Sequence, residues 1–225
     1  MDVQEATTRR LPDLKERHLP ENCRETINTI LKETYGYEQF RNLEIYDDLS
    51  KGKEKLCISQ GQLIENVILE AEKAWKSETQ VDNILLTAPT GSGKSLLFQL
   101  PAIYLGKEYN LLTIVVSPLK ALIVDQVESL QELGYARVAY ASSDLSPEQK
   151  MEVYRQVREG EIDLFYLSPE LLLSYDIKHF VGERRIGLVV VDEAHTVTTW
   201  GKAFRVDYWF LGRYLNTLKQ TLGYN

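Results

Sequence analysis

The stretch APTGSGKS at residues 88–95 has the residue types and spacing of a loop that binds phosphate groups. Gly91 and Gly93 let the backbone curl so that successive N–H groups point at phosphate oxygens. Lys94 can reach the outer phosphates of a nucleoside triphosphate, and the Ser95 hydroxyl can ligate Mg²⁺. The first position of the motif is Ala88 where glycine is usual. The predicted contacts to the nucleotide are Thr90, Gly91, Ser92, Gly93, Lys94 and Ser95.

The stretch DEAH at residues 192–195 follows an apolar run, where carboxylates are costly unless they have a task. Asp192 fits a direct or outer ligand of Mg²⁺, and Glu193 fits the group that orients and deprotonates an attacking water. His195 stands beside them and is a further catalytic candidate. With Lys94 upstream, these residues indicate hydrolysis of a nucleotide, with ATP and Mg²⁺ as cofactors.

Five short apolar segments must position these residues. They alternate with segments of helical spacing, and each ends in residues typical of turns. The pattern predicts an α/β fold with a mostly parallel central sheet flanked by helices. In such sheets, ligands bind at the carboxyl ends of the strands. The predicted strands are 83–89, 111–118, 137–143, 162–169 and 186–193, and the helices between them are 93–106, 118–134 and 146–160.

The first 59 residues differ in character, because they are charged and show no strand signal. One helix is predicted within residues 21–36, ending at Gly36, and residues 46–55 are expected to form an exposed loop. A second helix, at 61–77, leads into the first predicted strand. We therefore expect a mainly helical N-terminal extension at 1–59 and one nucleotide-binding domain at 60–225.

The composition of the 225 residues is that of an ordinary globular protein, with 44% hydrophobic and 26% charged residues. A formal net charge of −7 argues against a protein that grips nucleic acid by bulk electrostatics, so any such contact is expected to be local. The two cysteines have no metal-binding spacing. No apolar run has the length of a membrane span, so we expect a cytoplasmic protein without a membrane partner.

Three stretches carry a resemblance to a known family: VVSPLKALIVDQVESL at 115–130, YLSPELLLS at 166–174 and VDEAHTVTTWGKAFRVDY at 191–208. They resemble the first-domain motifs of superfamily 2 DNA helicases of the RecQ type, from about residue 60 onward. The resemblance implies a RecA-like P-loop NTPase fold. It also implies ATP-dependent 3′–5′ unwinding, with single-stranded and duplex DNA as partners.

The resemblance also assigns nucleic-acid contacts. Trp200, Phe204 and Arg205 match the family's aromatic-rich loop, which senses single-stranded DNA and couples it to the ATPase. Aromatic faces suit this task because they stack on any base. Two positions depart from the family pattern: the dipeptide at 202–203 is Lys-Ala instead of His-Asp, and residue 206 is valine instead of proline. Backbone contacts to DNA are expected from Ser117, Lys120 and Ser168.

The family reads adenine with a glutamine ahead of the phosphate loop. Gln62 is our candidate, because Gly61-Gln62 precedes Lys94 at a suitable distance and an amide can both donate to and accept from adenine. The competing interpretation is a surface glutamine at the start of a helix.

The family's second RecA-like motor domain has no counterpart among the motifs of this sequence. We therefore expect a first motor domain that needs such a partner for hydrolysis and unwinding. Two alternatives remain open: a non-hydrolysing nucleotide- and DNA-binding module that acts through partners, and an RNA helicase domain. The tryptophan-glycine and phenylalanine-arginine loop favours DNA over RNA.

Overall fold

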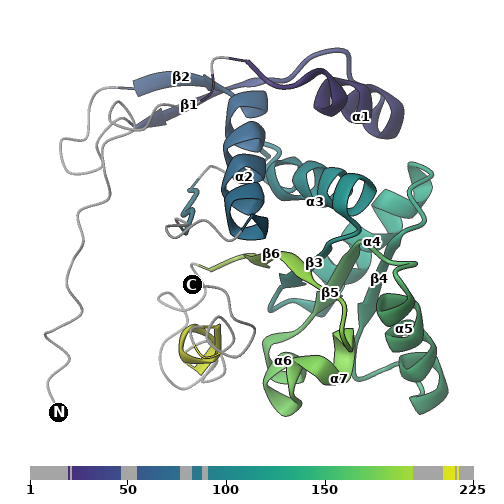
Figure 1. Ribbon diagram of the computed structural model, residues 1–225. Helices are drawn as coiled ribbons and strands as arrows, with labels where there is room; N and C mark the ends of the chain where they lie inside the picture. The colour runs from purple at the N-terminus through teal and green to yellow at the C-terminus, as the bar shows by residue number, and fades with distance from the viewer. Residues whose placement is uncertain are drawn as a thin grey trace, which may run out of the picture.

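The computed structural model describes residues 20, 22–46, 55–76, 83–87, 91–194, 210–215 and 217. Its centre is a four-stranded sheet in the order β4-β5-β3-β6, in which every neighbouring pair is parallel (Figure 1). The strands are β3 (Leu112–Val116), β4 (Val138–Ala141), β5 (Leu164–Leu167) and β6 (Ile186–Val191). This arrangement confirms the expected α/β, RecA-like fold class.

Side chains from the sheet pack into a core on each face, which is why β3 and β5 are buried along their whole length. On β5, Leu164 and Tyr166 join one core, whereas Phe165 and Leu167 join the other. The first core is completed by the helices α1 (Glu25–Tyr35), α2 (Gln60–Trp75), α3 (Leu96–Tyr109) and α4 (Lys120–Glu132). The second is completed by α5 (Pro147–Glu159), α6 (Pro169–Ser174) and α7 (Ile177–Val181).

Local signals set the helix ends as expected. At the start of α5, the Ser146 hydroxyl accepts a hydrogen bond from the Gln149 N–H at 3.2 Å, and the Gln149 side chain accepts one from the Ser146 N–H at 2.8 Å. At the end of α1, Gly36 has a φ of 68°, a left-handed conformation that suits glycine. The predicted boundaries at 146 and 36 are therefore confirmed.

Two strands occur where none was predicted. β1 (Asn42–Tyr46) and β2 (Lys55–Ser59) pair antiparallel, apart from the central sheet, and are drawn at the top of Figure 1. Leu43 lies opposite Ile58, and both side chains are buried in the first core. The expectation that residues 1–59 lack strands was wrong, because these short alternating segments are stabilised by each other and by the core beneath them.

The strand predicted at 83–89 is not confirmed. Residues 83–87 form no strand, and the side chain of Leu85 is 68% exposed. Among the described strands, β6 pairs with β3 alone, so residues 83–87 take no place beside it. An apolar, β-branched segment becomes a strand only where a neighbour supplies backbone partners.

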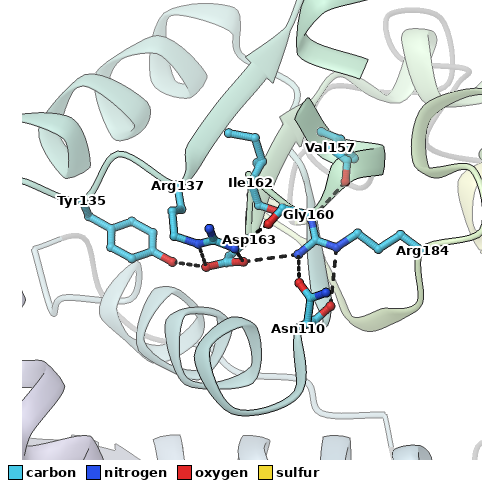
Figure 2. A network of polar contacts seen from close by, with 8 residues as sticks. All are labelled: Asn110, Tyr135, Arg137, Val157, Gly160, Ile162, Asp163 and Arg184. Atoms are coloured by element: carbon cyan, nitrogen blue, oxygen red, sulfur yellow. Dashed lines mark hydrogen bonds and ion pairs between the residues drawn. The ribbon is translucent and has the colours of Figure 1, made fainter. Parts of the chain in front are cut away.

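A buried ionic network holds the amino ends of the strands together (Figure 2). Its centre is Asp163, which directly precedes β5 and is fully buried. The Asp163 carboxylate accepts hydrogen bonds from the Tyr135 hydroxyl at 2.7 Å, from Arg137 at 2.7 and 2.8 Å, and from Arg184 at 3.2 Å. Arg184 also donates to the Asn110 side chain at 3.3 Å. Because these residues precede β3, β4, β5 and β6, this amino-edge network stabilises one end of the sheet and leaves the other end for a site.

Candidate nucleotide site and nucleic-acid interface

Three predicted site residues lie at the carboxyl edge of the sheet. Ser117 follows β3, Ser168 follows β5 and Asp192 follows β6. Backbone hydrogen bonds join these strand ends, since the Ser117 N–H donates to the Leu167 carbonyl at 3.1 Å and the Asp192 N–H donates to the Val116 carbonyl at 2.9 Å. The parallel ladder therefore brings residues from three distant parts of the sequence to one edge, where ligands bind in such folds.

The described part of the phosphate loop has the backbone that the motif requires. Gly91 and Gly93 have φ values of 79° and 76°, in the left-handed region that only glycine enters at little cost. Lys94 and Ser95 follow directly, and α3 begins at Leu96. The loop therefore opens onto the N-terminus of a helix, which favours bound anions.

Gln60 supports this loop and was missed by the sequence analysis. The buried side chain of Gln60 donates a hydrogen bond to the Ser92 carbonyl at 3.1 Å and accepts one from the Arg41 N–H at 3.2 Å. A Cβ on Gly93 would lie 2.7 Å from the Gln60 amide nitrogen. The glycine at 93 thus serves close packing as well as its own φ angle. The only signal in the sequence was a second glutamine beside Gly61.

Gln62, the candidate for adenine recognition, caps the helix that it begins. The Gln62 amide oxygen accepts a hydrogen bond from the Ser59 N–H at 3.1 Å, and the Ser59 hydroxyl accepts one from the Gly61 N–H at 3.2 Å. Ser59 and Gln62 form the capping box of α2, in which the Ser59 hydroxyl also accepts from the Gln62 N–H. The side chain therefore has a structural partner.

The two carboxylates of the acidic stretch occupy a tight turn after β6. Glu193 has a φ of 50°, which is unusual for a residue with a side chain, and its N–H donates to the Asp192 carboxylate at 2.9 Å. Burial raises the pKa of the Asp192 carboxyl above its ordinary value. The hydrogen bonds from the Glu193 N–H and the Gln126 amide, and the charge of Lys94, act against that rise, while the charge of Glu193 adds to it. Asp192 therefore lies within the electrostatic field of the phosphate-loop lysine.

The groups at this edge fit a magnesium nucleotide. Mg²⁺ prefers oxygen ligands and is usually held by one or two carboxylates together with phosphates. Ser95 and Asp192 supply a hydroxyl and a carboxylate of this kind, and Lys94 supplies a cation for phosphate. The buried hydroxyls of Ser92 and Ser117 have no hydrogen-bond partner among the described residues, so each has hydrogen-bonding capacity to offer a ligand.

The residues assigned to DNA backbone contacts differ in exposure. The Ser117 side chain is buried, and Ser168 caps α6 by accepting a hydrogen bond from the Leu171 N–H at 3.3 Å. Lys120 begins α4 and forms an ion pair with Asp144, and both side chains are exposed. Five further predicted residues lie outside the described residues: Thr90, His195, Trp200, Phe204 and Arg205.

Comparison with known proteins identifies the family. The model of the DEAD/DEAH box helicase family matches residues 69–223. The chain belongs to this family. Residues 69–223 include both the phosphate loop and the DEAH stretch, whereas Gln60 and Gln62 precede the matched region.

The curated relatives of this helicase chain include proteins of the RecQ type, which confirms the resemblance expected from the motifs. The ATP-dependent DNA helicase RecQ of Synechocystis is 33% identical over 202 residues, which are 89% of this chain and 35% of that protein. The Bacillus subtilis protein of the same name is 32% identical over 180 residues, 80% of this chain and 25% of its own length. The chain thus spans about a third or less of these relatives.

Solved structures of helicases also resemble the chain. The DUF1998 helicase MrfA, in a crystal structure with DNA and AMPPNP, has a TM-score of 0.46 and 22% identity over 80% of this chain and 22% of that one. The UvsW helicase of bacteriophage T4 has a TM-score of 0.47 and 17% identity, over 83% and 56%. No helix among the described residues is long and apolar enough to cross a membrane.

Proposed function

We propose that this chain is the ATP-binding motor domain of an ATP-dependent 3′–5′ DNA helicase of the RecQ type. The observation that supports it best is the shared edge of Lys94, after the glycine turns of the phosphate loop, and Asp192, at the end of β6. A lysine for phosphate near a partly buried carboxylate for a divalent cation is the arrangement that phosphoryl transfer requires. The names of the curated relatives support ATP and DNA as ligands.

Each residue has a proposed task in hydrolysis. Lys94 and the loop backbone bind the phosphates, and Ser95 and Asp192 hold Mg²⁺, which when bound neutralises charge on the phosphates. Glu193 orients a water and accepts its proton. The turn that ties the Glu193 N–H to Asp192 fixes the two carboxylates relative to each other. His195 is the proposed fourth member of the catalytic set.

The remaining contacts are proposed from the family resemblance. Gln62 recognises adenine. Thr90 and its neighbours in the phosphate loop bind the phosphates. Ser117, Lys120 and Ser168 contact the DNA backbone, and Trp200, Phe204 and Arg205 sense single-stranded DNA. A second RecA-like motor domain, in the same parent chain or in a separate one, supplies the other wall of the cleft, and the working compartment is the cytoplasm or nucleoid.

Replacing Lys94 with alanine tests the nucleotide site. Because Lys94 brings a cation to the phosphates, Lys94→Ala should weaken MgATP binding at least tenfold, about 1.4 kcal/mol. Isothermal titration calorimetry measures this directly. Lys107→Ala, on the exposed last turn of α3, is the matched control and should bind like the wild type. Equal affinity for MgATP in all three proteins would refute the assignment of the phosphate loop.

A further inference from the structure

A chain of polar side chains crosses the first core and ends on Asp192. The Tyr35 hydroxyl, on α1, donates to the Gln99 amide oxygen on α3 at 3.0 Å. The Gln99 amide nitrogen then donates to the Tyr166 hydroxyl on β5 at 3.2 Å and to the Gln126 amide oxygen on α4 at 3.5 Å. Finally, the Gln126 amide nitrogen donates to the Asp192 carboxylate at 3.4 Å. Four elements thus supply one continuous glutamine–tyrosine chain.

The hydrogen bonds of this chain all run in one direction. A carboxylate can only accept, so the Gln126 amide must turn its nitrogen toward Asp192 and its oxygen inward. That oxygen accepts from the Tyr166 hydroxyl at 3.1 Å as well as from Gln99. The Gln99 oxygen, in turn, faces the Tyr35 hydroxyl. Aligned bonds of this kind strengthen one another in a medium of low dielectric constant.

Burial makes the arrangement costly to break. Gln99 is 5% exposed and Tyr166 is fully buried. A buried amide or hydroxyl that loses its partner carries a desolvation penalty, so Gln99 and Tyr166 keep Gln126 in a single orientation. The other oxygen of the Asp192 carboxylate accepts from the Glu193 N–H. Asp192 is therefore held at both oxygens by donors with fixed positions.

From this geometry we infer that Gln126 is a positioning residue for the metal ligand Asp192, with Gln99 and Tyr166 fixing its orientation. The inference rests on the proposed function, because it takes Asp192 as a ligand of Mg²⁺. It also gives a structural connection between the proposed DNA contacts and the proposed metal ligand. Gln126 lies on α4, which begins with Lys120, close after Ser117, so the helix that adjoins the proposed DNA contacts also carries the residue that orients the carboxylate.

The test replaces Gln126 with methionine, which keeps the volume and removes the donor. Outer residues that orient a metal ligand typically change metal affinity 10–100-fold when mutated. We therefore expect Gln126→Met in the 225-residue chain to reduce, about tenfold, the gain in ATP affinity that Mg²⁺ produces, while ATP affinity in EDTA stays within about twofold of wild type. Calorimetric titrations with ATP, in Mg²⁺ and in EDTA, give both numbers. A residue that only supported the fold would lower both affinities together.

The matched control lies on the same helix. Gln131 donates its amide to the Val138 carbonyl at 3.5 Å, and Gln131→Met should leave the Mg²⁺ gain unchanged. Tyr166→Phe removes one hydroxyl and little volume, so it tests the hydrogen-bonded chain if Gln126→Met fails to fold. We expect about a threefold loss of the Mg²⁺ gain, since one of the bonds to Gln126 disappears.

Asp192→Asn distinguishes a failure of the positioning inference from a failure of the proposed metal site. If Asp192→Asn abolishes the Mg²⁺ gain while Gln126→Met and Tyr166→Phe keep it in full, the positioning inference is overturned and the proposed site stands. If the wild type shows no Mg²⁺ gain, or Asp192→Asn retains it, the proposed metal site itself is wrong. Loss of the gain in Asp192→Asn, Gln126→Met and Tyr166→Phe, with Gln131→Met unaffected, supports the inference.

Discussion

At the scale of single residues, the amino-edge network leaves no room for a side chain at Gly106. Gly106 lies within α3, and a Cβ built on it would come within 2.3 Å of the Asp163 side-chain carbon Cγ. Asp163 cannot yield, because Tyr135, Arg137 and Arg184 hold its carboxylate. The helix therefore tolerates a glycine at this position to bring α3 close to the amino-edge network.

Gly106→Ala should destabilise the protein by about 1–3 kcal/mol, since overpacking outweighs the gain of about 1 kcal/mol in helix propensity. Gly212, in the helical segment at 210–215, is the matched control, because a Cβ there comes within 4 Å of no other described residue. Gly212→Ala should be neutral or stabilising by up to about 1 kcal/mol. Urea denaturation of both variants measures the two free energies of unfolding. Equal effects in the two variants would contradict the packing argument.

The residues found from the sequence and those missed differ in the range of their interactions. Lys94, Asp192 and the glycine turns belong to local motifs, in which spacing alone indicates the chemistry. Gln60 and Gln99 act through partners 32 and 67 positions away in the chain. A lone glutamine carries no periodicity or spacing signal, so the support of the phosphate loop and of Asp192 could be recognised only in three dimensions.

At the scale of elements, the parallel strands with helices between them were predictable and the N-terminal part was not. β3 to β6 and α3 to α5 follow apolar runs and helical spacing that cover most of each element. β1 and β2 carry only a short alternation around Leu43 and Ile58, and their stability comes from pairing with each other. The apolar segment at 83–87 shows the reverse case, a strand pattern without a strand among the described partners.

Arg24 fixes the start of α1 to the two helices beneath it. Its guanidinium donates to Glu65 on α2 at 2.5 and 2.8 Å, to Glu72 on α2 at 2.7 Å and to the Tyr104 hydroxyl on α3 at 2.5 Å. The Glu65 and Glu72 side chains are only 7% and 10% exposed. Burial by itself raises the pKa of the Glu72 carboxyl, but hydrogen bonds from Arg24, Tyr109 and Tyr104 hold it below its ordinary value.

Arg24→Leu should destabilise the protein by about 3–5 kcal/mol at pH 7, because it leaves two buried carboxylates without their cation. A carboxyl whose native pKa is lowered stabilises the fold above its unfolded pKa and loses that contribution as the pH falls. The difference between wild type and variant should therefore shrink below about pH 4.5. Urea denaturation at pH 7 and at pH 4 measures it.

Arg155→Leu on α5 is the control for this prediction, since Arg155 also contacts three glutamates. Those partners, Glu152, Glu159 and Glu161, are about half exposed, and such pairs contribute little to stability because solvent screens them. A loss in Arg24→Leu no greater than that in Arg155→Leu, or one that does not depend on pH, would show that α1 is held by apolar packing alone.

At the scale of the whole molecule, the two edges of the sheet have opposite roles. Asp163 and its partners hold the strands together at the amino edge. Lys94, Ser117 and Asp192 lie at the carboxyl edge. Several arginines are bound at the amino edge: Arg137 and Arg184 contact Asp163, and the Arg185 guanidinium lies 4.5 Å from the centre of the Trp75 ring. These cations are therefore at the far end of the strands from the proposed phosphates.

This separation predicts that the 225-residue chain alone binds ATP but hydrolyses it slowly. An arginine that approaches the phosphates contributes about 10³–10⁵ in rate to related enzymes, and we expect it from the second motor domain. Single-stranded DNA should bind weakly and with a steep dependence on salt, because only part of the proposed cleft is present.

The measurement is steady-state ATPase activity with and without single-stranded DNA, with Glu193→Gln as the control. DNA-stimulated turnover near 1 s⁻¹, a rate within the usual range for enzymes, would contradict the prediction if Glu193→Gln abolished it. In that case Arg41, whose N–H bonds to the Gln60 side chain behind the phosphate loop, is the first arginine to replace with alanine.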